Sequence, residues 1–200
     1  ACVREQVLSF LELCHGCGAC LLVCPEQALK KGKREIGIIE HGVTQYGAFS
    51  QGRLRVGEAM SRPLIRRLKA SLNGAGITII DSPPGTSCPV IEAVQGADYV
   101  VLVAESTPFG LADLRLTVEM LKKLSLRFGV VINRSGLGDQ RVEEYCSDES
   151  ITLLLKIPED RRIAEAYSRG ELVVRAVPQL VATFDSLSQS ILGHAVKTDG

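Results

Sequence analysis

The feature that most constrains this sequence is a run of four cysteines within eleven residues, which reads C-x2-C-x2-C-x3-C-P in the stretch CHGCGACLLVCP. Thiolates are soft ligands that suit iron–sulfur clusters, whereas zinc sites more often combine paired C-x2-C units from two places in a chain. Gly16 and Gly18 allow the backbone between the cysteines to turn tightly. We interpret the run as an iron–sulfur site, with zinc as the competing interpretation. The ligands predicted are Cys14, Cys17, Cys20 and Cys24.

The spacing matches the signature of bacterial ferredoxins, in which the fourth cysteine ligates the other cluster of a pair. Only one complete run is present, so two arrangements stay open. Either Cys24 closes a single 4Fe-4S cluster, or the first half of a two-cluster unit is missing and the first three cysteines need another ligand. Cys2 is the sole upstream thiol, and it lies twelve residues before Cys14, which is closer than a ferredoxin's upstream ligand normally sits.

Composition excludes several classes of protein. Lysine plus arginine and aspartate plus glutamate number 23 each, so no basic footprint for nucleic acid is visible across the 200 residues. No run of 18 apolar residues predicts a membrane span, and the N-terminus lacks the layout of a secretory signal. The seven cysteines are clustered instead of spread as in a disulfide framework. We expect a cytoplasmic protein with no nucleic-acid or membrane partner.

The pattern of hydrophobic residues changes near residue 35. We predict a ferredoxin-like segment over 1–34, ending in the basic stretch KKGKRE, and a nucleotide-binding α/β domain over 35–200. Near-continuous apolar runs are typical of strands buried on both faces of a parallel sheet. The predicted strands are 35–40, 46–52, 77–81, 98–105, 128–134 and 151–157. The predicted helices are 57–72, 88–95, 110–126, 138–147, 159–168 and 178–193. This alternation favours a doubly wound, mostly parallel sheet.

Ligands of such sheets bind at the carboxyl ends of the strands, which directs attention to the stretch ITIIDSPPGTSCPVIEAV. Asp81 ends an apolar run and is followed by a Pro-Pro-Gly turn, a pattern that resembles the segment of nucleotide hydrolases that contacts hydrated Mg²⁺ and the γ-phosphate. The alternative is that Asp81 merely caps an ordinary helix. Cys88 at the start of that helix is either a thiol of lowered pKa or a small packed residue.

Two further positions follow later strands. Asn133 ends FGVVIN, where its amide could pair with an adenine edge or could simply form a turn before Ser-Gly-Leu-Gly. Pro158 begins the stretch PEDRRIAEAYSRG, whose acidic residues in the first turn suit a helix start. Residues Arg62, Arg66, Arg67 and Lys69 form a basic helix face, which we expect to be solvated.

Taken in order, these pieces resemble the MinD/ParA-like P-loop ATPases that carry an inserted ferredoxin domain, relatives of the Mrp-type iron–sulfur carriers and of nitrogenase iron protein. The resemblance covers residues 5–180 and is most specific in DSPPGTSCPVIEAV, ESTPFGLADL, GVVINRSGLGD and IPEDRRIAEAYSRGE. It implies ATP and Mg²⁺ as cofactors, and a nucleotide-sandwich homodimer. It also implies that Asp81 and Gly85 belong to the switch at the γ-phosphate and that Asn133 and Pro158 lie around the adenine.

One family feature is missing from this sequence. The phosphate-binding signature G-x-x-x-x-G-K-[ST] occurs nowhere in the 200 residues, and KKGKRE lacks its glycine spacing. The family places that loop on the first strand, before the ferredoxin insertion. We therefore expect the chain to correspond to the later two-thirds of such a protein, to lack the first strand, and to hydrolyse no ATP alone.

Three functions compete. The first is a nucleotide-dependent carrier of iron–sulfur clusters, or a redox-coupled ATPase, with an iron–sulfur or electron-transfer protein as partner. The second is an iron–sulfur electron-transfer module whose α/β part is a non-catalytic scaffold. The third is a positioning ATPase, which the intact cysteine run disfavours because such proteins need no cluster.

Overall fold

The computed structural model of the chain describes residues 2–3, 6–7, 14, 16–72 and 76–195. It divides into two compact units, of which unit 1 is Ala1–Pro83 with Cys88–Ala93 and unit 2 is Pro84–Ser87 with Val94–Gly200. The predicted boundary near residue 35 concerns a smaller segment within unit 1 and stays a prediction. No helix of the described ranges combines the length and apolarity that a membrane crossing requires.

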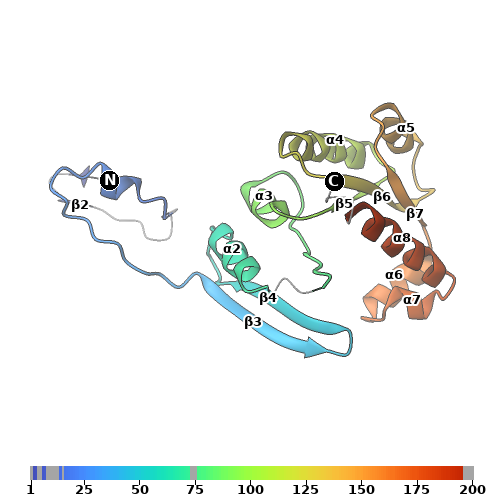
Figure 1. Cartoon of the computed structure of the whole chain (residues 1–200), viewed down its shortest axis with the longest axis horizontal. Coiled ribbons are helices and arrows are strands. Elements are labelled where there is room, and N and C mark those ends of the chain that lie inside the picture. Colours follow the sequence, from blue (N-terminus) through green and yellow to red (C-terminus); the bar gives the residue numbers. More distant parts are fainter. Residues whose placement is uncertain (1, 4–5, 8–13, 15, 73–75, 196–200) are drawn as a thin grey trace. The chain divides into compact units, whose positions relative to one another are not determined.

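Unit 1 begins with short elements and continues into a long hairpin (Figure 1). Two-residue strands β1 (Cys2–Val3) and β2 (Gln6–Val7) pair antiparallel, and helix α1 covers Ala19–Leu22. Strands β3 (Gly37–Thr44) and β4 (Gly47–Leu54) then form an antiparallel hairpin, which confirms the strands predicted at 35–40 and 46–52.

Helix α2 (Arg62–Ala70) packs on one face of the hairpin through its buried Leu64. A Cβ placed on Gly52 of β4 would lie 3.0 Å from Leu64 Cγ, so the absence of a side chain there lets the helix approach the strand. Helix α3 (Cys88–Val94) is held beside α2 by ion pairs described below. Beyond α2 the hairpin is exposed, with Val43 89% accessible.

Unit 2 contains a parallel three-stranded sheet in the order β5-β6-β7, which confirms the predicted α/β class with parallel strands. The strands are β5 (Val100–Glu105), β6 (Phe128–Ser135) and β7 (Leu153–Pro158). The helices are α4 (Pro108–Lys123), α5 (Arg141–Asp148), α6 (Arg161–Ser168), α7 (Val173–Ala176) and α8 (Leu180–Ala195). Figure 1 shows α4 and α5 on one side of the sheet and α8 on the other, as in doubly wound folds.

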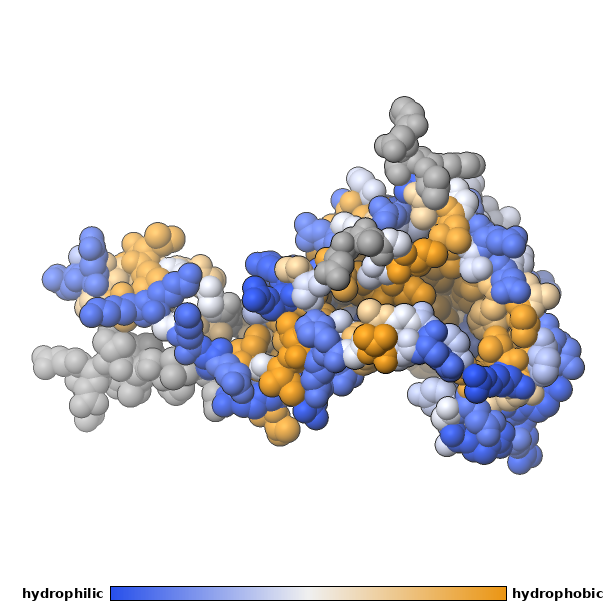
Figure 2. All heavy atoms as spheres, turned by 60° about the horizontal axis from the view of Figure 1, so that its bottom comes forward, coloured by the Kyte–Doolittle hydropathy of each residue, from blue (hydrophilic) through white to orange (hydrophobic). Residues whose placement is uncertain are grey.

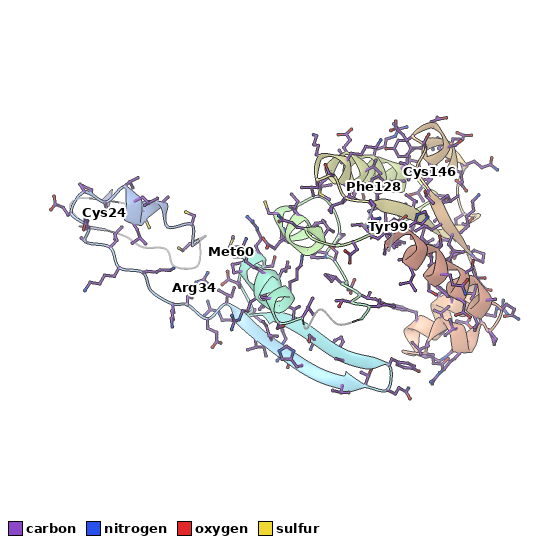
Figure 3. The ribbon with its side chains drawn as sticks, in the orientation of Figure 1. Cys24, Arg34, Met60, Tyr99, Phe128 and Cys146 are labelled. Atoms are coloured by element: carbon purple, nitrogen blue, oxygen red, sulfur yellow. The ribbon has the colours of Figure 1, made fainter. Side chains whose placement is uncertain are left out.

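The hydrophobic core of unit 2 lies between the sheet and helices α4 and α5. Val130 and Ile132 of β6, Val118 of α4, and Val142 and Cys146 of α5 are each at most 2% accessible. Alternate residues of β6 point to this face because side chains alternate along a strand. Figure 3 labels Cys146 on α5 and Phe128 at the start of β6, which packs against the edge of the same core.

The strand predicted at 77–81 is wrong. The segment makes no strand in the described part of the chain, and Ile77 and Ile79 are 73% and 91% accessible. A strand needs a neighbour that accepts and donates its backbone hydrogen bonds, and no described segment lies beside this one as such a partner. Strand β5 likewise has a described neighbour on one edge alone, and its Val103 is 65% accessible.

Candidate functional site

The cysteine loop is turned by two glycines in the left-handed backbone region. Gly16 has φ of +65° and Gly18 has φ of +77°, and Gly18 directly precedes α1. The amide of Leu21 donates to the Gly18 carbonyl at 3.0 Å, which starts the single turn that carries Cys20. An L side chain at either position would be strained, so the glycines fix how the loop folds between its thiols.

All four predicted ligands are free thiols. Cys14, Cys17 and Cys20 are exposed, and Cys24, labelled in Figure 3, is half-buried. Among the described residues no three metal-ligating side chains are gathered closely enough to hold a metal ion. The donor set nevertheless fits an iron–sulfur cluster, because four unpaired thiols come from one tightly turned loop, and thiolates are the ligands that such clusters take.

Downstream of the loop, Arg34 joins the chain to the rest of unit 1. Its guanidinium makes a bidentate ion pair with Glu58, whose side chain is fully buried. The Glu58 carboxylate also accepts a hydrogen bond from the Met60 amide at 3.0 Å. Figure 3 labels Arg34 and Met60. Hydrogen bonds from Arg34 hold the pKa of the Glu58 carboxyl below its usual value. The basic stretch that ends the predicted ferredoxin-like segment therefore has a fixed end.

The basic face of α2 is exposed at Arg62, Arg66 and Arg67, as predicted, and half-buried at Lys69, and three of these residues also contact α3. Arg62 and Arg66 pair with Glu92 of α3 at 3.3 and 2.9 Å. The Lys69 Nζ donates to the carbonyls of Glu92 and Ala93, each at 2.9 Å, at the carboxyl end of that helix. These contacts join α2 to α3 and satisfy helix-end carbonyls. Arg67 is exposed.

Two predicted site residues lie at the carboxyl edge of the sheet. Asn133 of β6 is opposite Glu105, the last residue of β5, and Pro158 ends β7 opposite Ser135 of β6. The Glu159 amide donates to the Ser135 carbonyl at 3.0 Å, which keeps the chain after β7 against the end of β6. The structure thus brings Asn133 and Pro158 to the ends of neighbouring strands, where ligands of open α/β sheets bind.

No pattern in the sequence identifies Arg134 as a residue that links the strand ends. It has φ of +54° although it carries a side chain, and its guanidinium pairs with Glu159 at 2.9 Å and Glu105 at 3.5 Å. The pKa of Arg134 is raised, mainly by its hydrogen bond to Glu159. It thus links the ends of all three strands. The register of the sheet brings these charges together, and neither residue spacing nor hydrophobic periodicity encodes that register between distant strands.

A buried hydroxyl lies near the same edge. Ser106, which follows β5, is 3% accessible, and its Oγ has no hydrogen-bond partner in the part of the chain that the structure describes. A Cβ on Gly138 would overlap the Ser106 carbonyl oxygen, so the loop after β6 passes directly over the end of β5. Thr107 then caps α4 by accepting from the Gly110 amide at 3.0 Å.

Asp81 and Gly85 belong to none of the three strands that form this edge. Asp81 is exposed and belongs to unit 1, whereas Gly85, with φ of +86°, belongs to unit 2. Helix α3 begins at Cys88, seven residues beyond Asp81, and the alternative that Asp81 caps this helix stays open. The assignment of Asp81 and Gly85 to a nucleotide switch stays a prediction.

Comparison with known proteins agrees with the cysteine run. Residues 10–30 match the family model described as "4Fe-4S binding domain". The uncharacterized protein MJ0579 of Methanocaldococcus jannaschii is 31% identical over 171 residues, which are 84% of this chain and 59% of that protein. The uncharacterized protein MJ0578 of the same organism is 35% identical over 164 residues, covering 68% of this chain and 59% of that protein.

The chain therefore spans 59% of the length of each of these two curated relatives. Among solved structures, the chain is similar to the MinD cell division protein of Aquifex aeolicus. That similarity has a TM-score of 0.46 and 24% sequence identity, and it covers 67% of this chain and 57% of that one.

Proposed function

We propose that this chain is the cluster-bearing part of a MinD-type ATPase that acts as a nucleotide-dependent iron–sulfur carrier or as a redox-coupled ATPase. The observation that carries the proposal is the run of Cys14, Cys17, Cys20 and Cys24, which coincides with the matched 4Fe-4S binding domain at residues 10–30. A bound 4Fe-4S cluster would supply one-electron chemistry. The chain's own loop would hold it near solvent, since three of the four thiols are exposed.

The nucleotide-dependent part of the proposal rests on the carboxyl edge of unit 2. Asn133 offers an amide with both donors and an acceptor, and Pro158 lies at the end of the neighbouring strand. In the proposed assembly these residues border the adenine of ATP, and Asp81 and Gly85 meet Mg²⁺ and the γ-phosphate. Two copies of the protein would enclose the nucleotide as a homodimer. Reduced thiols suit the cytoplasm, which we propose as the compartment.

The experiment that tests the cluster is anaerobic purification followed by iron and acid-labile sulfide analysis, absorption and electron paramagnetic resonance spectra. We expect a brown protein with both elements and with a reducible cluster. Cys14→Ser should abolish the colour, and Cys88→Ser is the matched control because this exposed thiol lies outside the run. A colourless protein that contains zinc alone would overturn the proposal.

A second candidate is an iron–sulfur electron-transfer module with a non-catalytic α/β scaffold. It is favoured by the absence of G-x-x-x-x-G-K-[ST] from the 200 residues, because that loop supplies the backbone amides and the lysine that hold phosphates. The two candidates differ in a longer version of the protein that includes a phosphate-binding loop. Magnesium-dependent ATP hydrolysis there supports the ATPase, whereas full cluster reduction without any nucleotide binding supports the module.

A further inference from the structure

A short basic segment lies directly after the cysteine loop. Lys30, Lys31 and Lys33 are exposed, and among the described residues no carboxylate forms an ion pair with them. Arg34 differs from them, because it is held by the buried Glu58. The three lysines therefore present positive charge to solvent, and the segment is attached to the rest of unit 1 at its end.

The segment follows the predicted cluster ligands closely in sequence. Lys30 follows Cys24 by six residues, and Lys33 follows it by nine. Six residues span at most about 20 Å even when fully extended, so Lys30 stays within that distance of the predicted ligand whatever path the chain takes. A protein that covers the cysteine loop and this segment would therefore meet the positive charge of the lysines.

Exposed apolar side chains accompany the lysines. Leu22 is 88% accessible and Val23 is 77% accessible, and both lie between Cys20 and Cys24. Figure 2 shows hydrophilic and hydrophobic residues beside one another over this N-terminal part of unit 1. Exposed apolar side chains and charged side chains are both ordinary components of protein–protein interfaces.

We propose that Leu22, Val23, Lys30, Lys31 and Lys33 form the docking surface for an acidic electron-transfer protein, which passes one electron to the cluster held by the cysteine loop. The proposal rests on the proposed cluster. No bond forms or breaks in the transfer, because the reduced partner loses one electron and the cluster gains it. Positive charge around the acceptor attracts an acidic donor and orients it with its redox centre toward the loop.

A nucleic acid or an anionic lipid surface would also be attracted by three lysines. The acidic redox protein is favoured because the lysines follow the predicted cluster ligands and two exposed apolar side chains closely in sequence, whereas the whole chain has no excess of basic residues. The partner's chemistry is therefore defined by negative surface charge and a one-electron centre. Nucleic-acid binding becomes a separate outcome of the test.

The test uses the reconstituted 200-residue protein and an acidic [2Fe–2S] ferredoxin as probe. Affinity for the oxidised probe is measured by calorimetry at several salt concentrations, and cluster reduction by the reduced probe is measured by stopped flow. Replacing Lys30, Lys31 and Lys33 together with Gln should weaken binding and slow reduction by about tenfold or more at low salt, with a flatter salt dependence. Reduction by dithionite should be unchanged.

Two matched controls separate local charge from net charge. The triple Lys→Arg variant keeps the charges and should bind the probe like the parent. Arg67→Gln combined with Lys123→Gln removes two exposed positive charges elsewhere and should leave binding unchanged. The proposal fails if the triple Gln variant binds and is reduced like the parent, if the two-charge control weakens binding equally, or if the lysines bind duplex DNA but not the ferredoxin. A preparation without iron and sulfide would refute the proposed cluster instead.

Discussion

The Arg134 guanidinium donates to Glu159 at 2.9 Å while its backbone has φ of +54°. The ion pair therefore links the end of β6 to the residue after β7 from a backbone conformation that L side chains rarely adopt. Its side chain also pairs with Glu105, the last residue of β5. At this residue the ion pairs stabilise the fold and the backbone conformation destabilises it. Substitutions at one position can therefore compare the two contributions to the free energy of unfolding.

The first prediction compares Arg134→Gly with Arg134→Ala. Both variants lose the ion pairs, which are exposed and contribute little, but only glycine relieves the left-handed strain. We expect the glycine variant to have the larger free energy of unfolding in urea titrations. An alanine variant as stable as the glycine variant would show that the backbone at this position is not strained.

The second prediction concerns the buried thiol of α5. Cys146 is 2% accessible and burial raises its pKa, so it packs as a small apolar side chain. Cys146→Ser would bury a hydroxyl among apolar neighbours and should lower the free energy of unfolding by about 1–3 kcal/mol. Cys88→Ser, at an exposed position, should change it by about 0.5 kcal/mol or less. Equal effects in denaturant titrations would contradict this packing role.

The third prediction is a pH dependence from Glu58. The hydrogen bond from Arg34 lowers the pKa of Glu58 in the folded protein from its ordinary value of 4.5. As pH falls, the Glu58 carboxylate is therefore protonated in the unfolded state before it is protonated in the folded state. The stabilisation is fully present above pH 4.5 and is lost as pH falls through the lowered pKa. The stability difference between the parent and Glu58→Gln should therefore shrink below pH 4.5 in thermal melts. Glu119→Gln, an exposed control, should show no such trend.

The fourth prediction tests the nucleotide assignment. In a longer version that includes a phosphate-binding loop, Asp81→Asn should lower kcat about a hundredfold or more, because loss of one preorganised charge commonly costs roughly 3 kcal/mol in the transition state. ATP affinity should fall much less, and cluster content should stay unchanged. Steady-state kinetics and a melting curve on one preparation decide the matter. Normal turnover with a lowered melting temperature would assign Asp81 a purely structural role.

Parts of this fold were predictable from sequence for a clear reason. Strands β5, β6 and β7 are apolar along nearly their whole length, and that pattern arises when both faces of a strand are covered. The same pattern at 77–81 led to a wrong strand prediction. A hydrophobic run shows that a segment can be buried, but a strand also needs a neighbouring strand with which to form backbone hydrogen bonds. Ile79, at 91% accessible, lies in that unpaired segment.

Among the candidate sites, the one built from neighbouring residues was predictable from sequence and those built from distant residues were not. The four cysteines were found because a cluster loop is local, so its ligands are neighbours in sequence. Arg134 and Glu159 are 25 residues apart and meet only through the register of β6 against β7. The contacts of Glu92 could not be predicted either, because its partners Arg62, Arg66 and Lys69 lie on another helix. In the sequence these three residues indicate only a basic helix face.

Strand β6 is the only one of the three parallel strands that is paired along both edges within the described residues, and Val130, Val131 and Ile132 are at most 2% accessible. The β3–β4 hairpin has no such protection, because its outer residues are open to water on both sides of the turn. Amide protons should therefore exchange with solvent on very different timescales along this one chain. Those of β6 should exchange only through large-scale opening of unit 2, whereas those near the hairpin tip should exchange through local fraying.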